Sequence, residues 1–281
     1  MSKRYTTILS IAGSDSIGGA GIQADIKTAC AHGVYAMTAI TAVTAQNTRG
    51  VDSYEPVGGE LLKAQLKAIL SDVRPDAVKI GMVPSAEAVK VIAEQIGRHK
   101  LRNVVVDPVM VSTSGSDLST DESVEAMRTL LFPKADLVTP NVSEASRLAG
   151  IKIEGSVQMM LAAMGIINSG QCAAVLVKSG DLRIDSDRTA DILSRRGKQP
   201  VEIVHRRVST RNTHGTGCSL STAIACNLAL GMEMEQAVRR AIDWITRAIE
   251  AGKEYRLGKG RGPINHFVRA DMPDDSKEMT I

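Results

Sequence analysis

The chain has 281 residues, a formal net charge of +3 and an aromatic content of only 2%. This balanced charge gives no reason to expect a nucleic-acid or membrane partner, and the few aromatic side chains leave no stacking platform for unpaired bases. The four cysteines form no C-x-x-C pair and no apolar run reaches the roughly 20 residues of a membrane span, so zinc, a disulfide framework and a membrane helix are not expected.

Short apolar runs alternate with amphipathic segments along the chain. Because these runs are nearly continuous, as in strands buried on both faces, strands are expected over residues 8–12, 38–45, 77–80, 104–107, 137–139 and 174–178. Helical spacing of apolar residues predicts helices over 60–71, 86–98, 123–131, 217–230 and 235–250. Residues 119–122 and 141–144 have the pattern of capping boxes that open helices, and 201–208 is a late strand-like stretch.

The alternation predicts an α/β fold, in which a mainly parallel sheet lies between helices. No linker or internal repeat interrupts the pattern, so we expect one domain over residues 1–268 and a polar tail over 269–281. The small, Ser/Gly-rich stretch 111–118 is a candidate flap. No signal-peptide pattern precedes the first strand, which favours the cytoplasm.

Informative residues follow successive predicted strands. They are Asp15, Gln46, Met82, Asp107 and Asn141. Ligands of parallel sheets bind beyond the carboxyl ends of the strands, where these residues fall. The sequence therefore predicts a site at this edge of the sheet.

Two of these positions have competing interpretations. Residues 13–21 form a glycine-rich loop that could admit a ligand or be only a tight turn, and the loop has neither the Walker nor the dinucleotide glycine spacing. Gln46 offers a donor and an acceptor side by side, which suits the edge of an aminopyrimidine or pyridine-like ring, although a polar turn is the simpler interpretation.

Charged residues at strand ends suggest phosphate chemistry. Asp107 could bind magnesium or water, or be structural. Lys178 could reach a phosphate, or extend its ammonium group to solvent at a strand end.

Residues 212–219 combine two glycines with the predicted start of a helix. Free N–H groups at such a start form an anion site, and they should lower the pKa of Cys218, making it a candidate base or nucleophile. The alternative is a buried structural cysteine, which is the interpretation we favour for Cys226.

Four motifs in order, G-A-G-I-Q-A-D, A-Q-N-T, K-I-G-M and T-H-G-T-G-C, give the chain a family resemblance. From residue 7 to residue 267 it resembles the hydroxymethylpyrimidine/phosphomethylpyrimidine kinases of thiamine biosynthesis, in the ribokinase-like superfamily. The resemblance implies a three-layer α/β/α sandwich with a small flap or β-extension. It also implies transfer of phosphate from Mg-ATP to 4-amino-5-hydroxymethyl-2-methylpyrimidine, giving the monophosphate and then the diphosphate.

The resemblance further implies a homodimer and leaves use of a monovalent cation open. The nearest alternative is a pyridoxal/pyridoxine kinase of the same superfamily. A non-catalytic ligand-binding protein and a dinucleotide-dependent oxidoreductase are further alternatives, which the T-H-G-T-G-C segment and the missing glycine fingerprint respectively disfavour.

The strand-end residues and the positions that match the family together give the expected site. The expected ring pocket comprises Gln46, Gly13, Asp15, Met82 and Val109. The expected nucleotide and metal residues are Lys178, Asn141, Thr213 and Thr216 for ATP, with Asp107 and Glu144 for Mg²⁺. The expected catalytic group and anion hole are Cys218, Gly215, Gly217 and His214.

The chain departs from the family pattern at two places. Ile17 stands where the family has a small residue, which could change the size of the pocket. Ser179 and Asp181 replace residues of a common Lys-Gly-Gly-His pattern, which could change contacts on the nucleotide side.

Overall fold

Eight strands form one central sheet in this computed structural model, which describes residues 4–111, 118–180, 182 and 187–270. The strand order is β10-β9-β8-β7-β6-β5-β1-β2, and within it only β9 runs against the others. Their bounds are β1 Thr7–Ala12, β2 Tyr35–Ile40, β5 Ala77–Ile80, β6 Val104–Val106, β7 Leu137–Val138, β8 Ala174–Val177, β9 Arg188–Arg195 and β10 Val201–Arg206.

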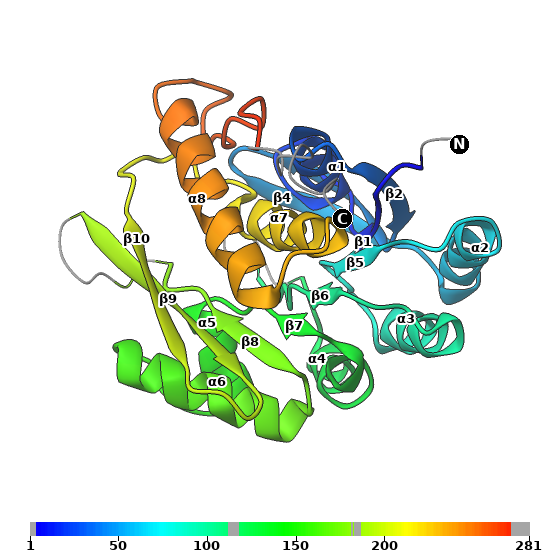
Figure 1. The fold of residues 1–281 in the computed structure, drawn as a ribbon. Helices are drawn as coiled ribbons and strands as arrows, with labels where there is room; N and C mark the ends of the chain where they lie inside the picture. Colours follow the sequence, from blue (N-terminus) through cyan, green and yellow to red (C-terminus); the bar gives the residue numbers. More distant parts are fainter. Residues whose placement is uncertain (1–3, 112–117, 181, 183–186, 271–281) are drawn as a thin grey trace, which may run out of the picture.

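Helices cover both faces of the sheet (Figure 1). One layer contains α2 Gly59–Leu70, α3 Ala86–His99, α4 Asp121–Ala126, α5 Val142–Ala149 and α6 Ser156–Gly170. The other contains α1 Gly21–Ala31, α7 Thr216–Ala229 and α8 Met234–Gly252. A π turn over Met127–Leu131 and a 3₁₀ turn over Phe132–Lys134 follow α4.

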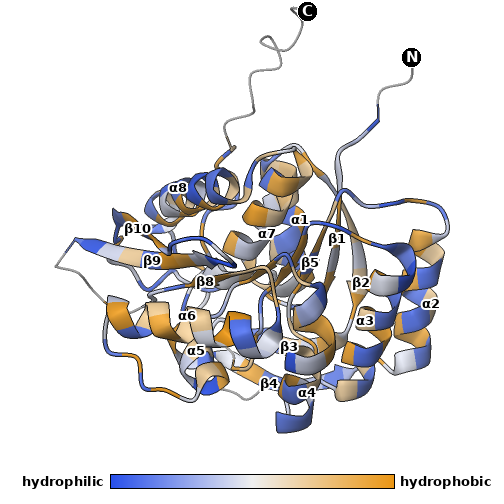
Figure 2. Cartoon of the chain, turned by 60° about the horizontal axis from the view of Figure 1, so that its bottom comes forward, coloured by the Kyte–Doolittle hydropathy of each residue, from blue (hydrophilic) through white to orange (hydrophobic). Residues whose placement is uncertain are grey.

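Strand residues alternate between two hydrophobic cores. In β6, Val104 and Val106 join the core under α2, α3 and α6, whereas Val105 joins the core under α1, α7 and α8. All three are fully buried, which explains why the run is apolar without interruption. Figure 2 shows hydrophilic residues on the outer surface of α8. The predicted three-layer α/β/α sandwich with a mainly parallel sheet is confirmed.

The strand expected over residues 38–45 is wrong in one respect, because it is two strands. β2 ends at Ile40, and the chain leaves the main sheet at Thr41, whose hydroxyl donates to the Met82 carbonyl at 2.6 Å. β3 (Ala42–Asn47) then pairs with β4 (Gly50–Pro56) in a separate antiparallel sheet. This hairpin is a β-extension beside the carboxyl end of the main sheet.

Several expectations shift by a few residues or lie outside the described part. The helix predicted from residue 123 begins at Asp121, with Thr120 as its N-cap. Residues 112–117 of the expected flap and 271–281 of the expected tail lie outside the described residues. No range was predicted from the sequence for α1, β4, α6 or β9.

Candidate active site

A cavity of about 810 Å³ opens at the carboxyl end of the parallel strands. All the predicted site residues line it, from both the ring set and the nucleotide set. They are Gly13, Asp15, Gln46, Met82, Asp107, Val109, Asn141, Glu144, Lys178, Thr213, His214, Gly215, Thr216, Gly217 and Cys218.

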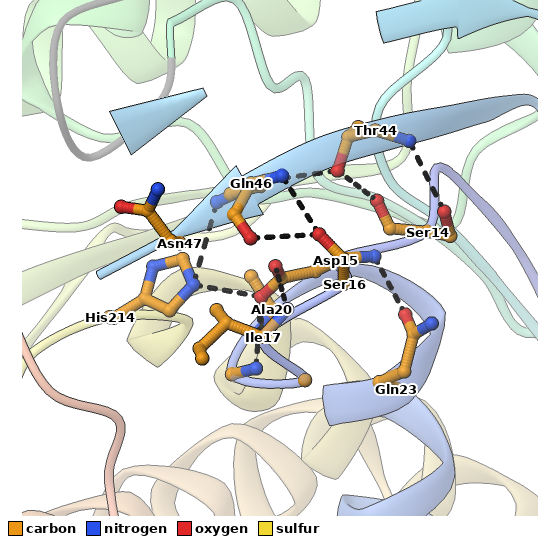
Figure 3. A network of polar contacts seen from close by, with 12 residues as sticks. Ser14, Asp15, Ser16, Ile17, Ala20, Gln23, Thr44, Gln46, Asn47 and His214 are labelled. Carbon is orange, nitrogen blue, oxygen red and sulfur yellow. Dashed lines mark hydrogen bonds and ion pairs between the residues drawn. The ribbon is translucent and has the colours of Figure 1, made fainter. Parts of the chain in front are cut away.

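Asp15 lies in the loop between β1 and α1 and is only 1% exposed. Its carboxylate accepts the backbone N–H groups of Ile17, Gly19 and Ala20 at 2.8–3.1 Å, and its Oδ2 lies 2.8 Å from Nε2 of His214 (Figure 3). Burial alone would raise the pKa of Asp15, but the bond to His214 and the N–H of Ala20 hold it below its ordinary value. The carboxylate is thus engaged within the protein.

The first glycine-rich loop and the start of α7 touch directly. Gly215 is the N-cap of α7 with φ of 78°, and a Cβ built on it would lie 1.8 Å from the carbonyl oxygen of Gly19. Only glycine fits both the backbone conformation and this contact. The Asp15–His214 bond joins the same two loops, so the ring side and the predicted anion hole share one rigid connection.

Gln46 sits at a β-bulge in the β3–β4 hairpin, where the pairing register shifts between Ala45 and Gln46. Bulges commonly turn a side chain toward a site. The Ser16 hydroxyl donates to the Gln46 carbonyl at 2.7 Å and accepts its N–H at 2.8 Å, which fixes the backbone. The Thr44 hydroxyl lies 3.4 Å from Oε1 of Gln46.

The tautomer of His214 decides what the Gln46 amide can do. Nε2 of His214 is 2.8 Å from the Asp15 carboxylate and 3.5 Å from Nε2 of Gln46. A carboxylate only accepts, so it places a proton on Nε2 of the histidine. That nitrogen then cannot accept from Gln46, and the amide keeps its donor available to a ligand in the cavity.

The other side of the cavity is charged. Nζ of Lys178 donates to Oδ1 of Asp107 at 2.7 Å, and the Thr139 hydroxyl donates to the same oxygen at 3.1 Å. A Cβ built on Gly217 would lie 3.3 Å from Nζ of Lys178 and 3.7 Å from Oδ2 of Asp107. The ion pair therefore lies beside the first turn of α7, as an anion site requires.

Glu144 is placed by the capping box predicted from the sequence. Asn141 is the N-cap of α5, its side chain accepts the N–H of Glu144 at 2.9 Å, and Glu144 accepts the N–H of Asn141 at 2.8 Å. Burial raises the pKa of Glu144 to about 7, with the Asp107 charge adding and the Lys178 charge opposing. A nearby cation would return this carboxyl to its ionised form.

The expected lowering of the pKa of Cys218 is wrong. Cys218 is half-buried in the first turn of α7, and burial raises its pKa, an effect that the Lys79 ammonium opposes. Burial outweighs the helix N-terminus here because the thiolate would lose its hydration. Asp25 and Asp107 also disfavour the thiolate.

Lys79 and Asp25 form a wholly buried ion pair near Cys218. Nζ of Lys79 donates to both carboxylate oxygens of Asp25 at 2.8 and 2.9 Å, and the hydroxyls of Ser10 and Thr222 donate to the same carboxylate at 2.6 and 2.7 Å. The Asp25 charge raises the pKa of Lys79 despite burial. This pair was not predicted from the sequence, although Asp25 ends one of the quoted motifs and Lys79 begins another.

The two departures from the family pattern have local roles. The Ile17 N–H donates to Asp15, so this residue supports the loop. The Ser179 N–H and hydroxyl both donate to Oδ1 of Asp191 at 2.8 and 3.0 Å, which ties the end of β8 to β9 at the cavity wall. Asp181 lies outside the described residues.

The donor set fits a hard cation only in part. Asp107 and Glu144 supply carboxylate oxygens, the ligand type that Mg²⁺ prefers, although burial raises the pKa of Glu144 and so favours its neutral form when no cation is near. Within the described ranges, no group of three or more His, Cys, Asp or Glu side chains could hold a metal by itself. Mg²⁺ usually completes its shell with waters and substrate phosphates.

Comparison with known proteins identifies the family. Residues 15–265 match the family model described as phosphomethylpyrimidine kinase. A hydroxymethylpyrimidine/phosphomethylpyrimidine kinase of Rhizobium meliloti is 47% identical over 262 residues, which cover 93% of this chain and 97% of that protein. The chain belongs to the phosphomethylpyrimidine kinase family. The resemblance predicted from the motifs is confirmed.

Longer members of the phosphomethylpyrimidine kinase family also match. The thiamine biosynthetic bifunctional enzyme of Arabidopsis thaliana is 46% identical over 281 residues, and the match covers 99% of this chain but 53% of the enzyme. The chain thus spans about half the length of this relative.

Solved structures agree with the fold of the phosphomethylpyrimidine kinase family. Phosphomethylpyrimidine kinase of Clostridium difficile is 42% identical with a TM-score of 0.75, covering 86% of this chain and 99% of that one. Pyridoxal kinase of Bacillus subtilis, in complex with ADP, is 35% identical with a TM-score of 0.84, covering 94% and 98%. Among the described helices, none has the length and apolar character needed to cross a membrane.

Proposed function

We propose that this chain uses ATP to phosphorylate 4-amino-5-hydroxymethyl-2-methylpyrimidine to its monophosphate and then to its diphosphate. The observation that supports this most is the shared cavity. Gln46 lines one side, and Lys178 and the start of α7 line the other. A ring held at Gln46 would place its hydroxymethyl group toward an anion site.

Ring binding would depend on Gln46 and the apolar wall. Gln46 keeps its NH₂ donor available because His214 is engaged with Asp15, and among the described residues its carbonyl oxygen has only the 3.4 Å contact with the Thr44 hydroxyl. Met82 and Val109 belong to a small apolar cluster under the β3–β4 hairpin, and a Cβ built on Gly13 would lie 3.0 Å from Sδ of Met82. A flat ring with a polar edge suits this wall.

Phosphoryl transfer would take place at the start of α7. The hydroxymethyl oxygen attacks the γ-phosphorus while the bond from that phosphorus to the β,γ-bridging oxygen breaks. The hydroxyl proton passes to the thiolate form of Cys218, which first loses its own proton to solvent. Lys178 and the N–H groups after Gly215 would stabilise the negative charge. The Lys79 ammonium favours the thiolate of Cys218 against burial.

Mg²⁺ would be held with the nucleotide by Asp107 and Glu144, and it would neutralise phosphate charge. Lys178 already pairs with Asp107 and would orient that carboxylate. Asn141, Thr213 and Thr216 line the same cavity and are the remaining proposed nucleotide contacts.

A direct assay tests the proposal. The purified chain is incubated with Mg-ATP and the aminopyrimidine alcohol, and the products are identified by mass. We expect the monophosphate first and the diphosphate later, with one ADP formed per phosphate transferred. No phosphorylation of the alcohol by a folded protein that binds ATP would overturn the proposal.

A second candidate is phosphorylation of pyridoxal, favoured by the TM-score of 0.84 with the Bacillus subtilis pyridoxal kinase. Both rings are flat heterocycles with a hydroxymethyl group, so the same site chemistry applies. Measuring kcat/KM for both alcohols in one preparation separates the two. We expect the aminopyrimidine to be preferred, and a preference for pyridoxal would favour the second candidate.

A further inference from the structure

A second cavity, of about 350 Å³, lies beside the candidate active site, and Gln46 and His214 line both. Its wall comes from the turn between β3 and β4, the loop before α7 and the loop after α8. Each of these segments contributes one arginine: Arg49, Arg211 and Arg261. The proposed reaction assigns no role to these three side chains.

The backbone of this junction is held by several contacts. The Thr48 hydroxyl accepts the N–H groups of Lys259 and Gly260 at 3.2 and 3.0 Å, and the Thr48 carbonyl accepts the N–H of Arg261 at 2.8 Å. A Cβ on Gly260 would lie 1.9 Å from that carbonyl oxygen, so glycine is required. Arg49 and Arg261 therefore project from backbone segments that are fixed to each other.

The three guanidinium groups have no side-chain or carbonyl partner within the described ranges. Asp52, an acidic residue of the same hairpin, bonds to Asn47 instead of to Arg49: its carboxylate accepts a hydrogen bond from the Asn47 side chain at 3.4 Å. Like charges around one hollow repel one another, and a cleft lined by one sign of charge concentrates the opposite ion. The planar fork of arginine matches phosphate oxygens in pairs.

We propose that this second cavity binds the phosphate group of the phosphorylated ring compound, with the ring at Gln46. Gln46 belongs to both walls, so one ring contact serves two orientations. In one the ring substituent faces α7, and in the other it faces the arginines. The second orientation attracts a dianionic phosphate and offers nothing to the neutral alcohol, so it would retain product without reaction. The identity of the ligand rests on the proposed function, but the anion site does not.

Arg49 gives the sharpest test, because it lines only the smaller cavity, whereas Arg211 and Arg261 line both. Inorganic pyrophosphate is titrated by calorimetry into protein saturated with Mg²⁺ and a non-hydrolysable ATP analogue. We expect wild type to bind it and Arg49→Ala to bind about tenfold more weakly, since a charge-assisted hydrogen bond is lost. Arg102→Ala removes an exposed arginine outside both cavities and should match wild type.

Equal affinity of Arg49→Ala and wild type would overturn the anion site, and so would a wild-type protein that binds no pyrophosphate. Arg49 is exposed, so its variant is expected to fold, which its melting temperature checks. A second arm adds aminopyrimidine monophosphate or the free alcohol. We expect only the monophosphate to displace pyrophosphate, and failure to do so would overturn the assigned ligand. Pyrophosphate binding without phosphorylation of the alcohol would contradict the proposed function alone.

Discussion

The ring side and the phosphate side of the large cavity are built on different principles. At the ring side, His214 bonds to Asp15, the Ser16 hydroxyl holds the Gln46 backbone, and two glycine-rich loops lie in contact. At the phosphate side, Lys178 and Glu144 are titratable groups in a buried setting, and the pKa values of both are raised. The ring side is thus preorganised by geometry, and the phosphate side is prepared electrostatically for an anion and a cation.

The largest expected effect is on the phosphate side, at Cys218. Cys218→Ala should lower kcat by about 10²–10⁴, the usual contribution of a general base, with a small change in KM for the alcohol. Cys30→Ala, at an exposed thiol of α1, is the matched control and should retain wild-type kcat. Steady-state assays of both variants decide this. Unchanged turnover of Cys218→Ala would remove the thiol from the mechanism.

The contact between the loop after β1 and the start of α7, which connects the ring side to the phosphate side, is tested by substituting two glycines. Gly215→Ala places a Cβ against the Gly19 carbonyl at a φ of 78° and should cost more than about 4 kcal/mol of unfolding free energy. Gly150→Ala, with a φ of 68° and open space around it, should cost about 1 kcal/mol. Urea unfolding measures both, and equal losses would mean that the loop contact is unimportant.

On the ring side, Asp15→Asn replaces an acceptor with an amide whose NH₂ opposes the incoming donors. The proton on Nε2 of His214 is no longer enforced, so Gln46 can donate to the histidine instead of the ring. We expect kcat/KM for the alcohol to fall about 10- to 100-fold, with KM for ATP changed less than about twofold. Asp243→Asn on the surface of α8 is the control. An equal loss for both substrates would indicate a general structural defect.

The smallest expected effect is on the pH dependence of the unfolding free energy. It comes from two buried histidines that line neither cavity. Burial lowers the pKa of His32 and of His266 to about 4, from 6.5 when unfolded. The unfolded chain therefore binds more protons between these values, and stability should fall as pH drops from about 6.5 to 4. Between pH 7 and pH 5 each contributes roughly 2 kcal/mol. His266→Gln should reduce the pH dependence of urea unfolding by that amount; an unchanged slope would contradict it.

The sequence predicted the central sheet well because its strands are buried on both faces and therefore uniformly apolar. It predicted less where contacts between distant segments determine where a strand or helix begins and ends. The apparently continuous strand ends before Thr41, whose hydroxyl bonds to the Met82 carbonyl of a distant segment. β9 pairs antiparallel near the sheet edge with a polar start, and α6 is too uniformly apolar to show helical periodicity.

The candidate site shows a similar limit. Motifs placed every predicted residue around one cavity, since they mark where strands end. The pKa of Cys218 could not be predicted in this way, because its local context suggests a lowered value and burial by distant segments raises it. The arginine-lined cavity joins three segments with no common motif, so only the folded chain brings Arg49 near Arg261.

The buried Lys79–Asp25 pair has a consequence for folding. Lys79 is on β5, Asp25 on α1, and Thr222 of α7 completes the network. If α1 packed without β5, or β5 without α1, one member of the ion pair would be buried without its partner in an apolar interior, which costs several kcal/mol. Partly assembled forms of this region are therefore disfavoured, and hydrogen exchange in α1, β5 and α7 should proceed through one concerted opening. The loops that form the site would then become ordered and unfold together.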